Sequence, residues 1–467
     1  MEEFVWVEKG DATEDQGRAS MTDATLLASI SSSPSTISSS TSTREHKNPL
    51  SKKAWELYFD DDGRIVQESL LRKAVFQGGV DGSIRREVWQ YLMGYFPFHT
   101  THLERDIIRR QLRVEYQSLK SRWKEMLEPS EAAKSPDDFE SLEDPQLIFM
   151  KLQADLNARR HIINEAEARG YLRVIKKDVP RTDRKEEYFS GDDNIHLTWL
   201  HDILVTYAVF HPQVGYAQGM NDILSMILYV MDDEADAYNC FSGYMAAVHR
   251  DFVCDGMVER LAKLQQLLHL TDPTLLAHFN TIDAGDLVFC HRWLLLSFKR
   301  EFSFNDSLVI FEILCSHHLE LNSVEADMTR NLEKRREKEK NLGDVGAGGV
   351  AEDGADALWW TQHKYKFDFF ICLAILKVFR VRFMSCADVA ALYSLTNGLV
   401  EKMDLRMILD AAESIFFDFC RQSAHTCKID NGTSKDQWTV WSVRSAFLGL
   451  RAGQGMKAIA PPPIFFG

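Results

Sequence analysis

The stretch V-I-K-K-D-V-P-R-T-D-R, from Val174 to Arg184, contains four basic residues, two aspartates and one proline. Proline fixes its own φ and biases the preceding residue, Val179, toward an extended conformation. The stretch therefore predicts that a helix through Ile175 ends near Asp178 and leaves Arg181 on a stiff connector. A guanidinium is planar, permanently charged and fork-shaped, which suits it to binding a phosphate. A solvated basic turn is the alternative, and charge composition alone leaves both open.

Composition restricts the protein to a few broad classes. A chain of 467 residues with 45% hydrophobic and 11% aromatic side chains has room for one large domain, or for roughly two or three ordinary ones. The formal net charge of −15 argues against nucleic acid as a partner, because nucleic-acid-binding proteins present a basic face. The eight cysteines form no C-x-x-C pair, which favours a reducing compartment over disulfides or a zinc site.

The ends of the chain carry few structural signals. The N-terminus lacks the apolar region of a secretory signal, and no apolar run approaches the roughly 20 residues of a membrane span. We therefore expect a cytoplasmic protein without a transmembrane segment. Residues 1–50 are poor in apolar side chains and include the Ser-rich run Ser29–Thr43, so they are predicted to be disordered. Residues 426–467 form a tail to which the sequence assigns no role.

A short motif lies at the start of this N-terminal segment. The residues Glu2–Val7 read E-E-F-V-W-V, with two aromatic residues behind two acids. They resemble short motifs that bind autophagy-related ubiquitin-like modifiers by strand addition. Motifs of this length also arise by chance, so both interpretations stay open.

Helical spacing dominates from residue 51 to residue 425. A stripe at intervals of four and three predicts one long amphipathic helix, and its members are Ile108, Leu112, Tyr116, Leu119, Trp123 and Met126. Ser83 is expected to cap a helix that continues to Leu92, and Leu147–Ala168 is predicted to be a single helix. Sustained period-two alternation is missing. We therefore predict an all-α fold, a single large domain in two helical halves.

One segment interrupts this pattern. Residues 320–361 contain the charge run E-K-R-R-E-K-E-K and then a glycine-rich run. Both features are typical of a solvated linker, so the sequence predicts a disordered insertion loop within the domain.

Two polar residues stand in special backbone contexts. Arg181 follows Pro180, and Gln218 lies in G-Y-A-Q-G-M-N-D beside Gly219. Glycine permits an unusual φ or the close approach of a partner. Taken singly, each of these residues is also explained as part of an ordinary loop or tight turn. Motifs for metal binding, P-loop nucleotide binding and a serine nucleophile elbow are missing from the chain.

The two contexts together resemble a known family. Ile175–Arg181 (I-K-K-D-V-P-R) is similar to the I-x-x-D-x-x-R signature of the TBC-domain Rab GTPase-activating proteins, and Tyr216–Gly219 (Y-A-Q-G) is similar to their Y-x-Q-G signature. Ile84–Trp89 (I-R-R-E-V-W) and Cys290–Phe302 (C-H-R-W-L-L-L-S-F-K-R-E-F) are supporting matches. The likeness runs from about Leu57 to Cys420, and the insertion makes the chain most similar to the insert-containing TBC subfamily.

The resemblance implies roles for particular residues. Arg181 would be an arginine finger inserted into a Rab-family GTPase, and Gln218 would orient the attacking water. Asp178 would hold Arg181 through a charge-assisted hydrogen bond. The other residues that the resemblance implies as supporting residues are Tyr216, Gly219, Arg85 and Trp89. For Arg85 and Trp89, packing in the core remains the alternative.

The resemblance also implies a cellular setting. The protein would be recruited peripherally to endomembranes or vesicles and would regulate vesicle trafficking or autophagy. It would need no cofactor of its own and would turn over no substrate of its own, because GTP and Mg²⁺ belong to the partner GTPase. A non-catalytic Rab-binding scaffold or effector is the alternative function.

Overall fold

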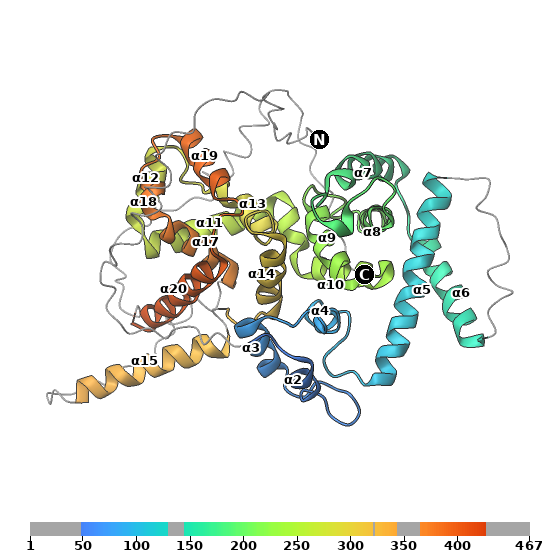
Figure 1. Cartoon of the computed structure of the whole chain (residues 1–467), viewed down its shortest axis with the longest axis horizontal. Helices are drawn as coiled ribbons and strands as arrows, with labels where there is room; N and C mark the ends of the chain where they lie inside the picture. The colour runs from blue at the N-terminus through green and yellow to red at the C-terminus, as the bar shows by residue number, and fades with distance from the viewer. Residues whose placement is uncertain (1–47, 129–143, 321–322, 343–364, 426–467) are drawn as a thin grey trace, which may run out of the picture. The chain divides into compact units, whose positions relative to one another are not determined.

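The computed structural model describes residues 48–128, 144–320, 323–342 and 365–425. The Ser-rich run, the Glu2–Val7 motif and the tail 426–467 lie outside the described residues. Helices account for the regular structure of the described part, which holds isolated β-bridges but no strand (Figure 1). The all-α prediction is confirmed.

The helices vary from single turns to long rods. In chain order the α-helices are α2 (Lys52–Glu56), α3 (Glu68–Gly78), α4 (Arg85–Leu92), α5 (His102–Leu127), α6 (Pro145–Arg160), α7 (Glu165–Asp178), α8 (Ile195–Phe210), α9 (Met220–Met231), α10 (Glu234–Val248), α11 (Cys254–Thr271), α12 (Pro273–Thr281), α13 (His291–Leu295), α14 (Phe304–Ser316), α15 (Val324–Leu342), α17 (Phe367–Val378), α18 (Arg380–Met384), α19 (Val389–Leu399) and α20 (Leu405–His425). Short 3-10 helices cover Val179–Arg181, Glu187–Phe189, His249–Phe252 and Val288–Cys290.

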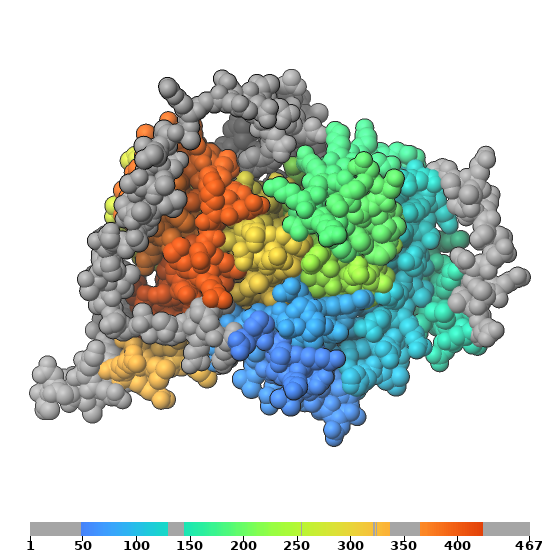
Figure 2. All heavy atoms as spheres, in the orientation of Figure 1, coloured from blue at the N-terminus to red at the C-terminus, as the bar shows by residue number. Residues whose placement is uncertain are grey.

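Two hydrophobic cores divide the described residues into halves. The first core takes its buried side chains mainly from α3 to α10, and the second takes them mainly from α11 to α20. Helix α14 contributes to both, because Phe311 is buried in the first core and Ile313 in the second. On the face drawn in Figure 2, the yellow segment that includes the start of α14 lies between the green helices of the first half and the orange helices of the second. The prediction of two helical halves is confirmed.

Helix α8 is the centre of the first half. It is apolar on nearly every side, and it packs against α5, α7, α9 and α10 (Figure 1). The C-terminal end of α7 and the N-terminal end of α9 carry the two sequence motifs. Because α7 and α9 both pack on α8, a single rigid helix fixes where each motif lies.

The chain before Arg181 differs from the prediction in two ways. Leu147–Ala168 is not one helix: α6 ends at Arg160, and Asn164 starts α7 by accepting hydrogen bonds from two backbone N–H groups. Helix α7 does end at Asp178 as predicted, but Val179 is helical (φ −57°, ψ −47°) and the chain continues as a 3-10 helix. The predicted extended connector was wrong. Burial of Val179 in the core outweighs the bias imposed by Pro180, whose missing N–H is not needed in the first turn of a helix.

Two further predictions are corrected. Ser83 does not cap α4, because Ile84 is the cap residue and the Ser83 hydroxyl donates to Asp81. Part of the predicted disordered insertion 320–361 is helical, since α15 covers Val324–Leu342 and packs on α20. The charge run consists of good helix formers, and Ala326 on the same helix is fully buried. Packing therefore decides the structure of residues that composition alone assigns to a loop. Residues 343–364 lie outside the described residues.

The start of α9 depends on a glycine. Gly219 has φ +104° and ψ −17°, a left-handed conformation that side chains disfavour. A Cβ atom at this position would lie 2.6 Å from Cδ2 of Leu296. Both the backbone and the neighbouring side chain therefore require glycine here.

Replacing Gly219 tests this requirement. Gly219→Ala should lower the free energy of unfolding by about 1–3 kcal/mol, because alanine is strained at positive φ and its methyl group meets Leu296. Gly170 in α7 is a matched control, since a Cβ there has nothing within 4 Å. Gly170→Ala should raise the stability by about 0.5–1 kcal/mol through helix propensity. Denaturant unfolding followed by circular dichroism measures both changes. If both substitutions changed the free energy of unfolding by the same amount and in the same direction, the requirement for glycine at position 219 would be contradicted.

Candidate functional site

The two sequence motifs meet at one carboxylate. Nη2 of Arg181 donates to Oδ1 of Asp178 at 2.7 Å, and the hydroxyl of Tyr216 donates to Oδ2 of the same carboxylate at 2.7 Å. Asp178 and Arg181 come from the first motif, and Tyr216 comes from the second. A single side chain thus joins two loops that are far apart in the sequence.

The carboxylate is buried and the guanidinium is exposed. The Asp178 side chain is 5% exposed, whereas the Arg181 side chain is 58% exposed. A guanidinium carries five N–H donors, and the contact with Asp178 uses one of them. The remaining donors form a fork that is open to solvent, and this geometry suits bidentate binding of an oxyanion.

A second connection between the loops runs through two buried polar residues. Nδ2 of Asn221 donates to the hydroxyl of Thr182 at 2.9 Å, and that hydroxyl donates to the carbonyl of Asp178 at 2.8 Å. The backbone N–H of Gly219 donates to Oδ1 of Asn221 at 3.2 Å. Thr182 and Asn221 were missed by the sequence reasoning. Their signal was position, since each is a polar residue within two positions of the end of one of the motifs.

Tyr216 keeps its proton over a wide pH range. Burial raises the pKa of the Tyr216 phenol well above its usual value, and the adjacent Asp178 carboxylate raises this pKa further. The phenol is therefore protonated at neutral pH and remains a donor to Asp178. The hydrogen bond from Tyr216 to Asp178 is therefore kept at neutral pH.

Gln218 lies at the tip of the second loop. Its side chain is exposed, and within the described parts of the chain it makes no hydrogen bond. The residues on both sides are fixed, because Tyr216 is bonded to Asp178 and Gly219 starts α9. Gln218 thus presents a free amide from a restrained backbone.

Arg85 and Trp89 do not reach this site. Both lie on α4 and both donate to Oε1 of Glu312 on α14, with Nε of Arg85 at 2.5 Å and Nε1 of Trp89 at 3.1 Å. The Glu312 side chain is fully buried, and burial raises the pKa of its carboxyl. These contacts join α4 to α14, so the core-packing alternative describes both residues. Of the predicted supporting residues, the structure brings Asp178, Tyr216 and Gly219 together with Arg181 and Gln218.

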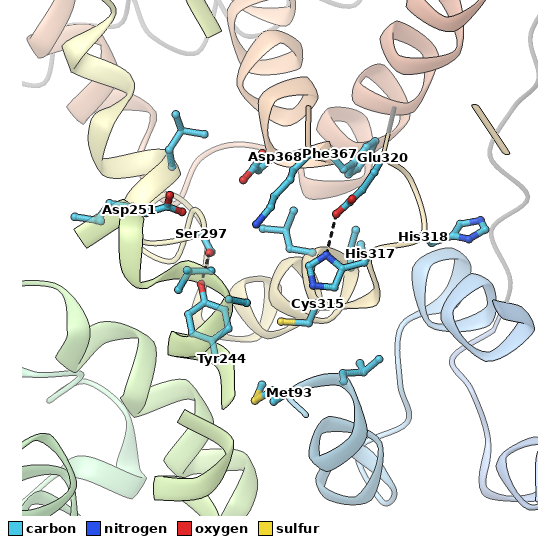
Figure 3. Close-up of a pocket in the computed structure, with 18 of the residues that line it drawn as sticks. Met93, Tyr244, Asp251, Ser297, Cys315, His317, His318, Glu320, Phe367 and Asp368 are labelled. Atoms are coloured by element: carbon cyan, nitrogen blue, oxygen red, sulfur yellow. Dashed lines mark hydrogen bonds and ion pairs between the residues drawn. The ribbon is translucent and has the colours of Figure 1, made fainter. Parts of the chain in front are cut away.

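A separate cavity lies away from Arg181 and Gln218. Figure 3 shows this cavity, of about 250 Å³, between α10, the end of α14 and the start of α17. Its wall includes the hydrogen-bonded pair Tyr244 and Ser297 and the pair His317 and Glu320. None of the predicted site residues lines it. We therefore place the candidate site on the surface formed by the two loops.

The described residues hold neither a metal-binding group nor a helix that could span a membrane. Histidine, cysteine and carboxylate side chains do not gather there into a group that could hold a metal ion. The helices in that part of the chain also fall short of the length and apolar character needed to span a membrane.

Comparisons with known proteins show which proteins this chain resembles. Residues 147–335 match the Rab-GTPase-TBC domain model. The chain is 38% identical over 274 residues to TBC1 domain family member 25 of Mus musculus, covering 58% of this chain and 32% of that protein. It is 34% identical over 276 residues to the GTPase-activating protein GYP7 of Candida glabrata, covering 58% of this chain and 35% of that protein. The chain thus spans about a third of the length of these curated relatives.

A solved structure supports the same fold. The Ypt/Rab-GAP domain of Gyp1p superimposes with a TM-score of 0.52 at 18% sequence identity, covering 79% of this chain and 98% of that chain. At this identity the similarity concerns the fold alone. The domain model, the curated relatives and the shared fold agree with the two motifs, and residues 147–335 of the chain are similar to the Rab-GTPase-TBC domain.

Proposed function

We propose that this protein accelerates GTP hydrolysis by a Rab-family GTPase, with Arg181 and Gln218 supplied in trans. The observation that carries the proposal is the Asp178 carboxylate, which joins an exposed arginine to the loop that presents an exposed glutamine. Its two relatives named above, one of them called a GTPase-activating protein, support the same activity.

The chemistry of GTP hydrolysis explains why this pair of side chains is suitable. Negative charge is spread over the transferring phosphoryl group in the transition state, and a water molecule must be aligned for attack. The free donors of Arg181 would stabilise that charge, and the amide of Gln218 would accept from and donate to the water. GTP and Mg²⁺ would be bound by the partner, so this chain would supply only donors and acceptors.

The hydrogen bond to the buried Asp178 restricts the orientation of the Arg181 side chain. An exposed arginine loses up to about 2 kcal/mol of side-chain entropy when it is fixed in one rotamer. Because Arg181 is already bonded to a buried carboxylate, part of this entropy is lost before the partner binds. Such preorganisation reduces the entropy that must still be lost when the transition state forms.

Removing the finger provides the main test. Arg181→Ala should lower the activated rate of hydrolysis by about 10³–10⁵, the contribution of an arginine supplied in trans. Arg181→Lys should also be strongly impaired, because an ammonium lacks the fork. Single-turnover GTP hydrolysis across a panel of purified Rab proteins measures these rates. Arg64→Ala is the control, since Arg64 pairs with Asp62 on the surface and contacts no residue of the site. Unchanged activity in Arg181→Ala would overturn the finger assignment.

Replacing the glutamine tests the second half of the proposal. Gln218→Ala should lower the activated rate by about 10²-fold or more, because the attacking water loses its orienting group. A Rab variant whose own catalytic glutamine is replaced by alanine should still respond to the unaltered protein. If Gln218→Ala is fully active and that Rab variant does not respond, the water is oriented by the GTPase itself.

A non-catalytic Rab-binding scaffold is the second candidate. Its exposed arginine and glutamine would then contact the partner without accelerating hydrolysis. Binding of one Rab without stimulation of any member of the panel would favour the scaffold. The broader setting that we propose is peripheral recruitment from the cytoplasm to endomembranes, with a role in vesicle trafficking or autophagy. This setting follows from the family resemblance.

A further inference from the structure

A third segment, which contains Lys299 and Arg300, forms ion pairs with both loops of the site. Nζ of Lys299 lies 2.5 Å from Oδ1 and 2.6 Å from Oδ2 of Asp183, which follows the finger motif by two residues. The Lys299 side chain is 4% exposed, so this ion pair is shielded from solvent on the lysine side. Asp183 has φ +45°, a left-handed conformation that needs support from its surroundings.

The neighbouring residue holds the second loop. Nη2 of Arg300 lies 2.9 Å from Oδ2 of Asp222, and Nε lies 3.2 Å from Oδ1. Asp222 is in the first turn of α9, three residues after Gly219, and its side chain is 7% exposed. Nζ of Lys299 is also 3.8 Å from Oδ1 of Asp222. One buried ammonium therefore lies between a carboxylate from each loop.

The lysine and arginine are themselves fixed from the second half of the domain. The Ser307 hydroxyl donates to the carbonyl of Lys299 at 2.9 Å. The carboxylate of Glu301, the residue after Arg300, accepts two hydrogen bonds from Arg292, at 2.7 and 3.1 Å. The carbonyl of Glu301 accepts from the backbone N–H of Glu401 at 3.0 Å. Lys299 and Arg300 thus belong to a rigid segment that is anchored independently of the two loops.

We infer that Lys299 and Arg300 are positioning residues that set the separation between Arg181 and Gln218. This inference rests on the proposed function. The Asp183 side chain is 16% exposed and the Asp222 side chain is 7% exposed, so the two carboxylates repel each other when no cation lies between them. A charge shielded from solvent that loses its partner destabilises its surroundings. Without Lys299, Asp183 and Asp222 would move apart and carry the finger and the glutamine with them. A displacement of about 1 Å in reacting groups can lower a rate by about 10²-fold.

The test uses single-turnover hydrolysis with a Rab that responds to the unaltered protein. Lys299→Met keeps the length of the side chain and removes its charge, so it should lower the maximal rate about 10²-fold while the Rab concentration at half-maximal rate changes little. Asp183→Asn should have a similar effect, and the two changes together should be far from additive. Lys299→Arg should retain a larger part of the rate. Lys263→Met, in the half-exposed pair with Glu259, is the matched control.

A second readout separates positioning from stability. If Lys299 acts through the finger, Lys299→Met should have little further effect in a protein that already carries Arg181→Ala. Circular dichroism melting curves identify any variant that fails to fold, and in that case the milder Asp183→Asn carries the test. A folded Lys299→Met protein with the unaltered maximal rate would overturn the inference. Failure of the unaltered protein to stimulate any Rab would instead overturn the proposed function.

Discussion

The buried carboxylate of Asp178 is the interaction on which the site depends. A carboxylate that is 5% exposed must be compensated by donors, because an unpaired buried charge is strongly destabilising. Its two oxygens take one donor from each motif, Arg181 and Tyr216. If either loop moved away, the Asp178 carboxylate would lose the hydrogen bond from Arg181 or the one from Tyr216. The motifs are therefore one unit, although they lie on opposite sides of α8 in the sequence.

Helix α8 explains why residues so distant in sequence form one site. Its 16 residues lie in the interval between Arg181 and Gln218, a separation of 37 residues (218 − 181). After Arg181 the chain runs to the C-terminal end of α9, where the Tyr188 hydroxyl donates to Asp232. Helix α8 then returns the chain through the core toward the start of α9. Because α8 is apolar all round and surrounded by four helices, it cannot shift without opening the core. The separation of the motifs thus reflects the length of a buried helix.

The sequence predicted correctly those features that depend on residues close together in the chain. The helices with a clear apolar stripe, the end of α7 at Asp178 and the contact between Asp178 and Arg181 agree with the structure. The helical conformation of Val179 and the helix α15 did not follow, because burial against distant residues outweighs a local bias. Lys299 and Arg300 could not be found as partners of Asp183 and Asp222, since their ion pairs span 116 and 78 residues. Long-range charge pairs leave no periodic pattern in a sequence.

The distribution of these contacts explains why the two halves form one domain. The first half supplies the exposed Arg181 and Gln218, and the second half supplies the cations that hold the loops behind them. Helix α14 joins the halves through the buried Glu312, which takes donors from Arg85 and Trp89 on α4. Glu312 is, like Asp178, a buried carboxylate, and its donors on α4 lie more than 220 residues away from it in the sequence. The loops that carry Arg181 and Gln218 therefore take side-chain contacts from both halves of the described residues, and such supporting contacts restrict the movement of a surface site.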